Sequence, residues 1–367
     1  MLLLLPLKSF TQIVETVITH PKIADGIYVD NSGNVFTTSG GLASGTEIGK
    51  YDISTNNFNP DFAVGFSGPI NIAPYRDSLY IVSNYDNSTV YAYNLNSNQI
   101  DTIALGLDEP AGIIIDANEN IFVTNWGQAP AWAGHQIHKI SSSGYVSNYA
   151  DSLILYRPQG ITINHLGELI VHSEQRLYKV NPSDSSLSLW VIVGHYIGNM
   201  VFRKKYSCIY GASNQGHKII KIDHLGDVSI FSGSELGYLD GEIGSALFER
   251  PIGVAFSKSE DTLYISEGLG ANRLRRVIMN ETVTVPSNKT QNVVGIYPNP
   301  SNGTYIIKVK DKNEISVEVY SSSGELIFFQ TKFNIETYLD LSKFPKGNYM
   351  IKLSDENQII TKKIIKI

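Results

Sequence analysis

The sequence predicts an all-β protein of about two domains, and three observations support this fold class. The chain has 367 residues, of which 42% are hydrophobic and 10% aromatic, a composition that suits packed cores and excludes a disordered chain. Short segments with alternating apolar and polar residues, typical of half-buried strands, occur along the whole chain. Over most of the chain these segments also repeat at a regular interval.

The repeat unit consists of a short strand, a polar turn and a second strand, followed by a third alternating strand. Two clear examples are Pro110–Gly127 and Pro251–Gly268, and the units start near residues 24, 69, 110, 158, 197 and 251. A period of about 40–50 residues with several strands per unit is typical of a four-stranded propeller blade. We therefore expect a six-bladed β-propeller over residues 12–279.

The two ends of this region predict how the ring closes. The sixth unit lacks a fourth strand after Arg276, whereas Gln12–Thr19 precedes the first unit and has no partner there. Because a propeller ring is usually sealed by combining both chain ends in one blade, we expect Gln12–Thr19 to be the outer strand of the last blade. A separate strand or tail is the alternative. We expect residues 1–11 to be a tail or a signal remnant, since Met1–Leu5 is shorter than the ~7–15 apolar residues of a signal core.

Sequence motifs in the last repeat add a family resemblance. Gly237–Ile278 combines a Gly-x-x-Asp-Gly turn, an Ala-x-Phe step, a Pro-x-Gly-Val-Ala strand and an Asn-x-x-Arg sequence. This order of motifs resembles NHL-repeat propellers and the wider gluconolactonase-like superfamily. The resemblance implies the fold and says little about activity, because this architecture carries many functions.

The C-terminal region differs in composition and charge. Residues 280–293, NETVTVPSNKTQNV, match no blade, so we interpret them as a linker. Residues 294–367 contain short alternating segments separated by turn residues, as in a small Ig-like β-sandwich. This region has 10 Lys and 8 Asp or Glu, a net charge of +2, so the total of −6 leaves −8 for residues 1–293. We expect residues 294–367 to be a separate domain.

Four motifs follow one another in this region, and each is short. Their main residues are Tyr297, Pro298, Asn299, Pro300 and Gly303, then Gly324, then Gly347 and Tyr349 after Leu341–Phe344, and finally Lys362 and Lys363. Together they resemble the C-terminal sorting domain of type IX secretion cargo in Bacteroidetes. The resemblance implies export through the periplasm to the outer-membrane surface or the medium, with the type IX translocon as partner. An Ig-like module that only packs is the alternative.

Composition also excludes several classes of partner and site. With a net charge of −6 and no long basic run, the chain is not expected to bind nucleic acid. A single cysteine, Cys208, excludes an internal disulfide and a multi-cysteine zinc site. No apolar run approaches the ~20 residues of a membrane helix, so we expect no transmembrane segment.

The loops at one mouth of a propeller are its usual binding surface. In each blade we expect two positions to face this mouth. The residues that open the first strands are Asp25, Ile70, Ala111, Gln159, Gly198 and Ile252, and those that end the second strands are Ser39, Ser83, Asn125, Ser173, Ser213 and Glu267. The metal-dependent lactonases of the superfamily imply one divalent cation held by Glu, Asn and Asp, which we place at the first set of positions.

A hard cation needs several oxygen ligands, usually with two or more charges. In the first set only Asp25 and Gln159 are polar, so we predict no cofactor. Asp25 together with Glu267 remains the candidate pair for a cation such as calcium. His172 lies within a strand, where a histidine with ordinary hydrogen bonds is a better interpretation than a zinc ligand.

The third repeat contains an aromatic loop. Asn125 and Trp126 open an insertion that includes Trp132. Aromatic loops at a propeller mouth suit stacking against a glycan or a peptide. The alternative is that these side chains pack one blade onto the next.

The sequence therefore favours an exported, non-catalytic binding propeller whose ligand is a glycan, a peptide or a surface protein. The candidate contacts are Asp25, Asn125, Trp126, Trp132, Gln159 and Glu267. A metal-dependent lactonase-like hydrolase or lyase, with Asp25 and Glu267 as ligands, is the alternative. A structural adhesin without a small ligand is a third interpretation.

Overall fold

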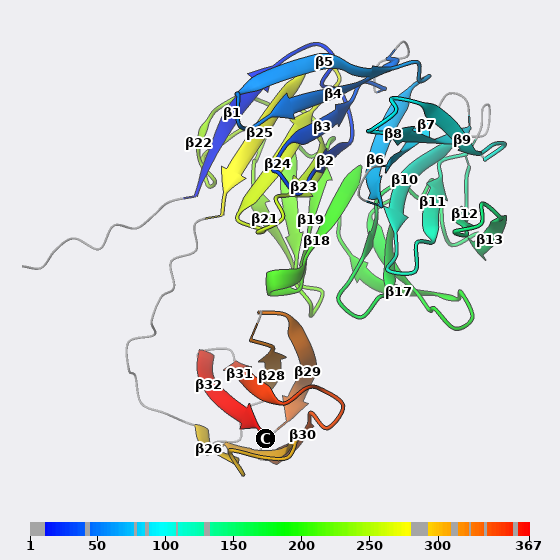
Figure 1. Ribbon diagram of the computed structural model, residues 1–367. Helices are drawn as coiled ribbons and strands as arrows, with labels where there is room; N and C mark the ends of the chain where they lie inside the picture. The colour runs from blue at the N-terminus through cyan, green and yellow to red at the C-terminus, as the bar shows by residue number, and fades with distance from the viewer. Residues whose placement is uncertain are drawn as a thin grey trace, which may run out of the picture. The chain divides into compact units, whose positions relative to one another are not determined.

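The computed structural model describes residues 12–40, 45–76, 79–84, 88–107, 109–127, 133–279, 293–309, 315–322, 324–333, 336–354 and 359–367. Its strands fall into two compact units, β1–β25 and β26–β32 (Figure 1). Residues 1–11 and all but the last residue of the expected linker lie outside the described ranges. The expected all-β fold class is confirmed.

The first three blades are antiparallel four-stranded sheets, each ordered from its first to its fourth strand. Blade 1 is formed by β2 (Ile27–Val29), β3 (Val35–Thr38), β4 (Glu47–Asp52) and β5 (Asn57–Val64). Blade 2 is formed by β6 (Pro69–Tyr75), β7 (Leu79–Asn84), β8 (Thr89–Asn94) and β9 (Ile100–Ala104). Blade 3 is formed by β10 (Pro110–Ile115), β11 (Ile121–Asn125), β12 (Gln136–Ile140) and β13 (Val146–Asp151).

The next two blades repeat this order, and the last blade departs from it. Blade 4 is formed by β14 (Ile161–Ile163), β15 (Leu169–Ser173), β16 (Arg176–Val180) and β17 (Leu187–Ile192). Blade 5 is formed by β18 (Asn199–Arg203), β19 (Cys208–Ser213), β20 (Lys218–Ile222) and β21 (Val228–Ser232), with a short 3₁₀ turn at Lys204–Tyr206. Blade 6 contains β23 (Pro251–Phe256), β24 (Thr262–Glu267), β25 (Arg273–Ile278), β1 (Ile13–Thr19) and β22 (Gly241–Glu242).

The ring closes through β1. This strand, from the start of the chain, pairs antiparallel with β25 and on its other edge with β22. The expectation that Gln12–Thr19 completes the last blade is therefore confirmed by strand pairing. The first strands β2, β6, β10, β14, β18 and β23 each contact the next one around the ring, including β23 with β2, and lie toward its centre (Figure 1).

Hydrophobic clusters lie between neighbouring blades rather than within one. One cluster combines Ile27 and Val35 of blade 1 with Tyr264 and Leu274 of blade 6. Such packing follows from the alternation in each strand, because both faces of a blade are covered by a neighbour. The second strands carry apolar residues on both faces because each face packs against a neighbouring blade.

A recurring pair of hydrogen bonds through a Thr or Ser hydroxyl links the first strands of neighbouring blades. In blade 3 the Gly112 amide donates to Thr124 Oγ1 (2.8 Å), and this hydroxyl donates to the Gln159 carbonyl of blade 4 (2.8 Å). In blade 6 the Gly253 amide donates to Ser266 Oγ (2.9 Å), which donates to the Asp25 carbonyl of blade 1. A Cβ at residue 112 would lie 2.0 Å from the Gln159 oxygen, so glycine is required there. These hydrogen bonds fix the backbone positions of Asp25 and Gln159.

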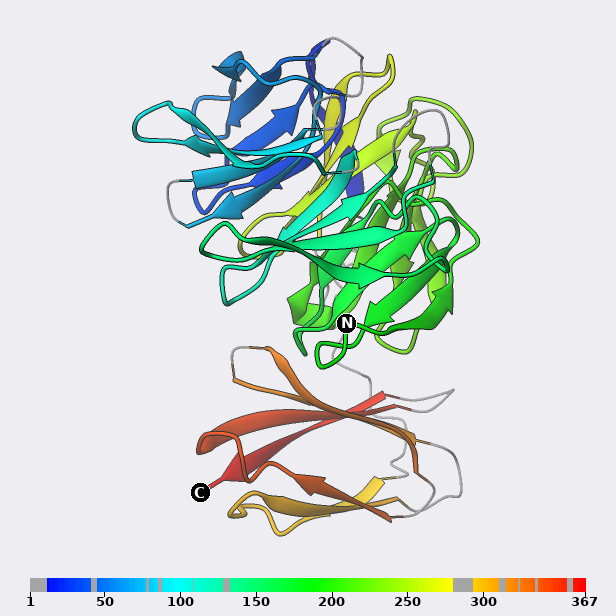
Figure 2. The same ribbon diagram turned by 90° about the vertical axis from the view of Figure 1, so that its right-hand side faces the viewer.

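The C-terminal unit is a sandwich of two sheets that lie face to face (Figure 2). The three-stranded sheet contains β26 (Val293–Tyr297), β27 (Thr304–Val309) and β30 (Glu336–Asp340). The other sheet has the order β29 (Leu326–Phe333), β28 (Ile315–Tyr320), β31 (Gly347–Ser354) and β32 (Ile359–Lys366). Its core includes Tyr305, Val317, Val319, Leu339 and Ile364, all fully buried. This confirms the expected Ig-like sandwich.

In the described part of the chain no helix is both long and apolar enough to span a membrane.

Candidate functional site

The two sets of predicted mouth positions do lie at one end of the ring. Pro110 at the start of β10 pairs with Asn125 at the end of β11, and Pro251 at the start of β23 pairs with Glu267 at the end of β24. The connections between second and third strands and between blades lie at the same end, since strands alternate in direction. This end is called the mouth below.

Two asparagines join opposite blades across the centre of the ring. Asn199 Nδ2 of blade 5 donates to Asn71 Oδ1 of blade 2 (3.3 Å). Each asparagine also accepts a hydrogen bond from the amide that follows it, at 2.9 Å for Ile72 and 2.8 Å for Met200. In a six-membered ring these blades are opposite, so the pair forms a polar floor beneath the mouth. The sequence marks this pair, because both asparagines occupy the repeat position that is glycine in the other four repeats.

Asp25 lies at the start of blade 1, one residue before a glycine. It retains some accessible surface, but protein atoms surround it, and its carboxyl has no hydrogen-bond partner within the described ranges. Desolvation raises the pKa of this carboxyl well above its usual range. Burial therefore disfavours the charged form of this side chain.

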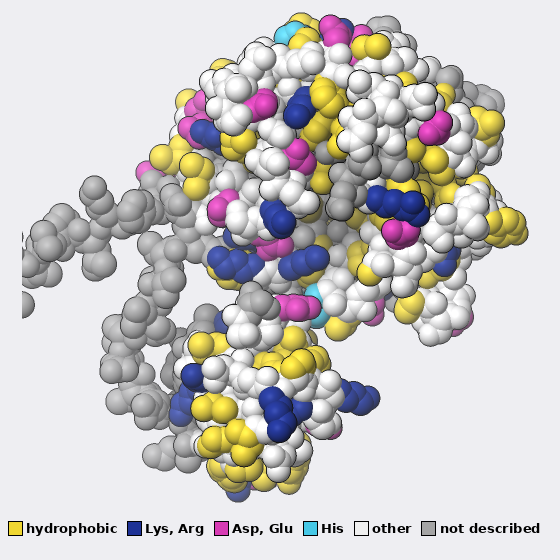
Figure 3. Space-filling view, in the orientation of Figure 1, with side chains coloured by type: hydrophobic (Ala, Val, Ile, Leu, Met, Phe, Trp, Pro, Cys, Tyr) yellow, Lys and Arg dark blue, Asp and Glu magenta, His cyan; other side chains and the backbone are white. Residues whose placement is uncertain are grey.

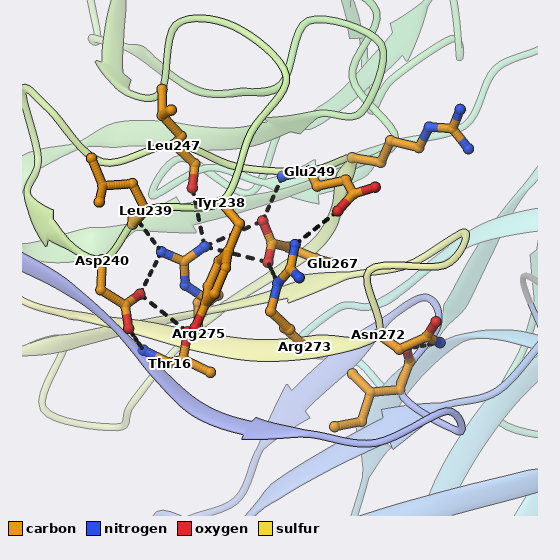
Figure 4. A network of polar contacts seen from close by, with 12 residues as sticks. Thr16, Tyr238, Leu239, Asp240, Leu247, Glu249, Glu267, Asn272, Arg273 and Arg275 are labelled. Carbon is orange, nitrogen blue, oxygen red and sulfur yellow. Dashed lines mark hydrogen bonds and ion pairs between the residues drawn. The ribbon is translucent and has the colours of Figure 1, made fainter.

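Glu267 is fully buried and bound to protein cations (Figure 4). Its carboxylate accepts from Arg273 Nε (2.7 Å), from Arg275 Nη1 (3.3 Å) and from the Glu249 amide (2.7 Å). Arg275, which is also fully buried, donates further to the Leu239 and Leu247 carbonyls and to Asp240. The oxygens that a metal ion or a ligand would need are therefore engaged.

This group of side chains holds the ring closed. The Thr16 amide of β1 donates to Asp240 Oδ2 (3.0 Å), and the Tyr238 ring lies over the Arg273 guanidinium, 4.1 Å from its Cζ. We call Thr16, Tyr238, Asp240, Glu267, Arg273 and Arg275 the closure network (Figure 4). Tyr238 and Asp240 belong to the Gly-x-x-Asp-Gly turn and Arg275 to the Asn-x-x-Arg motif, so the residues that carry the NHL resemblance have a structural role here.

An aromatic and polar cluster lies at the mouth above blades 3, 4 and 5. Trp126 and Tyr196 meet edge to face, with ring centroids 6.0 Å apart, and Tyr196 also meets the edge of His172 at 5.4 Å. The Tyr196 hydroxyl donates to Gln159 Oε1 (2.9 Å). The Arg157 guanidinium lies 5.6 Å from the Trp126 ring centroid. We call Trp126, Arg157, Gln159, His172 and Tyr196 the mouth cluster.

Backbone hydrogen bonds position Trp126 in this cluster. Its amide donates to the Glu109 carbonyl (2.9 Å), and its carbonyl accepts from the Gly134 amide (2.9 Å). The Gly134 carbonyl in turn accepts from the Arg157 amide (2.9 Å). Neighbouring connections are therefore tied together, and the tryptophan has a fixed place at the mouth.

His172 supports the cluster from below. It is fully buried, and its Nε2 accepts from the Ile197 amide (3.1 Å). Burial lowers the pKa of His172 to about 4, so the ring is neutral at physiological pH. Its Nδ1 has no hydrogen-bond partner among the described residues, so only one of its two nitrogens is bonded.

Asn125 immediately precedes Trp126 in the sequence. Its side chain is fully buried, yet neither Oδ1 nor Nδ2 has a hydrogen-bond partner in the part of the chain that the structure describes. An unpaired buried amide costs about 1–3 kcal/mol, which a bound ligand would recover. Trp132 lies outside the described residues.

The structure thus brings Trp126, Gln159 and Asn125 to one side of the mouth, and places Asp25 and Glu267 in blades 1 and 6. Sequence reasoning missed Tyr196, which joins Trp126 to Gln159, because an isolated tyrosine before a first strand carries no pattern of its own. The divalent cation of the lactonases does not fit the pair Asp25 and Glu267, because Glu267 is engaged by two arginines and a hard cation usually needs two or more charged ligands. Within the described ranges, no three His, Cys, Asp or Glu side chains are grouped to hold a metal ion.

In the C-terminal domain, the predicted sorting residues lie at turns and on the strands β26, β31 and β32. Gly303, Gly324 and Gly347 have positive φ angles of 123°, 84° and 154°. Tyr297 is 41% exposed, and its neighbours Pro298, Asn299 and Pro300 are exposed as well. Tyr349 is buried, Lys363 is exposed and Lys362 is half-buried. Lys side chains are spread over the visible face of this domain, in keeping with its net positive charge (Figure 3).

The propeller is similar in fold to several solved structures. A gluconolactonase from Xanthomonas campestris matches with a TM-score of 0.57 and 11% identity, over 72% of this chain and 89% of its own. An auxiliary nutrient binding protein from Bacteroides thetaiotaomicron matches with a TM-score of 0.58 and 14% identity, over 72% of this chain and 76% of its own. A virginiamycin B lyase from Staphylococcus aureus matches with a TM-score of 0.54 and 14% identity, over 73% of this chain and 99% of its own. At these identities the likeness shows the fold alone.

No curated protein matches the chain. A family model does match its C-terminal domain: residues 295–367 match the secretion system C-terminal sorting domain. This match covers the expected motifs from Tyr297 to Lys363 and confirms the expected destination. The C-terminal domain belongs to the family of type IX secretion sorting domains, and the protein is a cargo that is secreted or held at the cell surface.

Proposed function

We propose that the propeller is a non-catalytic binding module that the sorting domain delivers to the outside of the cell, and that its ligand binds at the mouth cluster. The observation that carries this proposal is the side-chain amide of the fully buried Asn125, the residue before Trp126, which has no hydrogen-bond partner within the described ranges. Buried amides without partners are rare in folded proteins and are commonly completed by a bound group. Stacking on an aromatic ring combined with hydrogen bonds to amides suits a glycan or a peptide.

Exposed apolar side chains extend this surface. The connection between β13 and β14 carries Leu153, Ile154 and Tyr156, which are 87%, 50% and 41% exposed. Arg157 follows them and lies against both Tyr156 and Trp126. An exposed apolar group on a connecting loop, next to fixed polar groups, is typical of a binding surface.

Glycan and peptide arrays, followed by calorimetry with the best ligand, test this proposal. Trp126→Ala is expected to weaken binding at least ten-fold, because the stacking surface is removed. Trp190→Ala is the matched control, since Trp190 lies on the fourth strand of blade 4 against Lys179, away from the mouth. Equal binding by the wild type and Trp126→Ala, or equal losses in both variants, would contradict the proposed site.

The metal-dependent lactonase or lyase remains the second candidate, and Asp25 is the observation that favours it. Its carboxyl has no hydrogen-bond partner within the described ranges, so its oxygens would be available to a cation that found further ligands other than Glu267. Thermal melting with added calcium distinguishes the two functions. A rise in melting temperature that Asp25→Asn abolishes would favour the enzyme, whereas no calcium dependence is expected for the binding module.

A further inference from the structure

A buried serine hydroxyl at the mouth of blade 5 lacks a hydrogen-bond partner. Ser213 is the last residue of β19 and is 1% exposed, and its Oγ is unpaired among the described residues. In blade 1 the serine at the same repeat position is bonded, since Ser39 Oγ donates to Glu47 Oε2 (3.0 Å). In blade 4 Ser173 Oγ donates to the Tyr156 carbonyl (2.9 Å). The serine of blade 5 therefore differs from its bonded counterparts in blades 1 and 4.

Blade 1 shows what can complete this position. Glu47 begins β4 and lies opposite Ser39, whose amide donates to the Glu47 carbonyl (3.2 Å). The carboxylate of Glu47 accepts from the Ser39 hydroxyl and pairs with the Lys22 ammonium (2.9 Å). One carboxylate is therefore shared by a hydroxyl and an ammonium, and both donate to it.

Blade 5 has the same two donors without the carboxylate. Lys218 begins β20 and pairs with Ser213 in the strand register. Directly opposite residues of an antiparallel pair point to the same face of the sheet, so the two side chains are neighbours. Lys218 forms no ion pair within the described ranges. Because a carboxylate has two oxygens that accept hydrogen bonds, one carboxylate would complete both Ser213 and Lys218.

His195 borders the same place. A Cβ at residue 216 would lie 2.6 Å from Ser213 Oγ and 3.5 Å from His195 Nδ1, so Gly216 adjoins both groups and adds no side chain there. Burial and the Lys218 ammonium lower the pKa of His195. The positive charge of Lys218 therefore acts on the imidazole. We call Ser213, His195 and Lys218 the blade 5 subsite.

The blade 5 subsite adjoins the mouth cluster. His195 directly precedes Tyr196, whose ring meets the edge of Trp126. The His195 carbonyl also lies 3.3 Å from Nε2 of His172, which belongs to the cluster. A ligand that contacts the aromatic rings of the mouth cluster is therefore close to the unpaired hydroxyl and the ammonium of the subsite.

We propose that the blade 5 subsite binds a carboxylate, and that the ligand at the mouth is an acidic glycan that contains a hexuronic acid. In such a sugar the carboxylate is attached directly to the ring, so a short glycan can reach both the aromatic rings and the subsite in a nearly rigid form. An acidic peptide carries its carboxylates on flexible side chains and loses more conformational entropy on binding. This inference rests on the proposed function and names the class of its ligand.

Calorimetry with two matched probes tests the inference. The first probe is trigalacturonate, and the second is its trimethyl ester, the same glycan without charge. We expect the wild type to bind the acid at least about ten-fold more tightly, because the carboxylate forms charge-assisted hydrogen bonds in the subsite. Equal affinity for the two probes, or no binding of either, would overturn the inference. Tighter binding of triglutamate than of trigalacturonate would also overturn it, in favour of a peptide ligand.

Lys218→Gln locates the effect. This variant keeps a polar side chain and removes the charge, so the preference for the acid should fall to less than about two-fold. Lys221→Gln is the matched control, because Lys221 is a half-buried lysine of the same strand that lies opposite Tyr210 instead of Ser213. Both variants change the net charge equally. If Lys221→Gln reduces the preference as strongly as Lys218→Gln, overall charge is the cause and the subsite is wrong.

Two further variants test the hydroxyl and separate the inference from the proposed function. Ser213→Ala should weaken binding of trigalacturonate by about three- to ten-fold, and unchanged affinity would contradict the subsite. Trp126→Ala should weaken both probes and preserve the preference for the acid. If Trp126→Ala weakens both probes but the wild type shows no preference, only the acidic ligand is refuted. If the wild type binds both probes and Trp126→Ala binds them equally well, the proposed site at the mouth cluster is refuted.

Discussion

The buried polar side chains of the closing blade and those of the mouth above blades 3–5 differ in their hydrogen bonding. In the closure network, Glu267 and Arg275 are fully buried, and both are bonded to charged and backbone partners. At the mouth, Asn125 is equally buried, and neither of its side-chain polar atoms has a partner within the described ranges.

The difference shows how structural and ligand-binding polar groups can be told apart. A buried polar group contributes to stability only when its hydrogen bonds are made within the protein. In the closure network Glu267 and the Nη1 and Nη2 groups of Arg275 meet this condition, whereas Arg275 Nε does not, so we assign the network to holding the ring together. Asn125 does not meet it within the described ranges, and the ligand proposed above would supply the missing partners.

The largest effect is expected from removing the closing strand. Deleting residues 1–20 removes β1, exposes the edge of β25 and leaves the closure network without Thr16. We expect the propeller to melt at least about 10 °C lower. The shorter deletion of residues 1–11 is the control and should leave the melting temperature unchanged; a full-length melting temperature after the longer deletion would refute closure by β1.

Breaking the closure network comes next. Arg275→Ala leaves the carboxylate of Glu267 buried with one arginine fewer, and removing one partner of a buried ion pair costs about 3–5 kcal/mol. Arg176→Ala breaks an exposed ion pair with Glu174 and should cost about 0–1 kcal/mol. Denaturant unfolding measures both free energies, and equal losses would show that the network does not hold the ring.

The pH dependence of stability sharpens the comparison, because His172 is a buried titratable group at the mouth. Its folded pKa, about 4, lies below its unfolded value, so the unfolded state binds the proton more readily. The contribution of neutral His172 is complete above about pH 6.5 and is lost as pH falls toward 4, by at most about 3 kcal/mol.

The measurement is the difference in unfolding free energy between the wild type and His172→Gln across this pH range. Taking the difference removes the opposite trend of Asp25, whose raised pKa lowers stability as pH rises. A difference that does not change between pH 4 and 7 would show that His172 does not resist protonation.

The smallest effect compares two buried asparagines directly. Asn272 Nδ2 donates to the Pro21 and Ile23 carbonyls, so Asn272→Ala should cost about 1–3 kcal/mol. Asn125→Ala removes an amide that has no hydrogen-bond partner among the described residues, so it should cost less than about 1 kcal/mol while it weakens ligand binding. Chemical denaturation measures the unfolding free energies of both variants. A greater loss of stability in Asn125→Ala than in Asn272→Ala would mean that the Asn125 amide has hydrogen-bond partners within the protein.

Much of the fold could be predicted from the sequence because the repeat and the strand alternation are local patterns. The six blades, the closing strand and the C-terminal sandwich all follow from such patterns. The candidate site was harder to predict. Trp126 and Gln159 belong to different repeats, and the contact between them passes through Tyr196, which no local pattern distinguishes. Glu267 fits the mouth pattern in the sequence, yet two arginines from the next strand engage it.

The sequence by itself determined the architecture and the destination of this protein, because repeat period, alternation and short sorting motifs are properties of neighbouring residues. Only the tertiary structure decided what the buried polar groups do, since hydrogen bonding depends on residues that are distant in the chain. Asn71 and Asn199 are 128 positions apart and meet across the ring, and Asn299 meets Ile365 at a separation of 66. Whether a buried polar side chain is satisfied is therefore settled by the packing of the blades and sheets, and this decides whether it supports the fold or is open to a ligand.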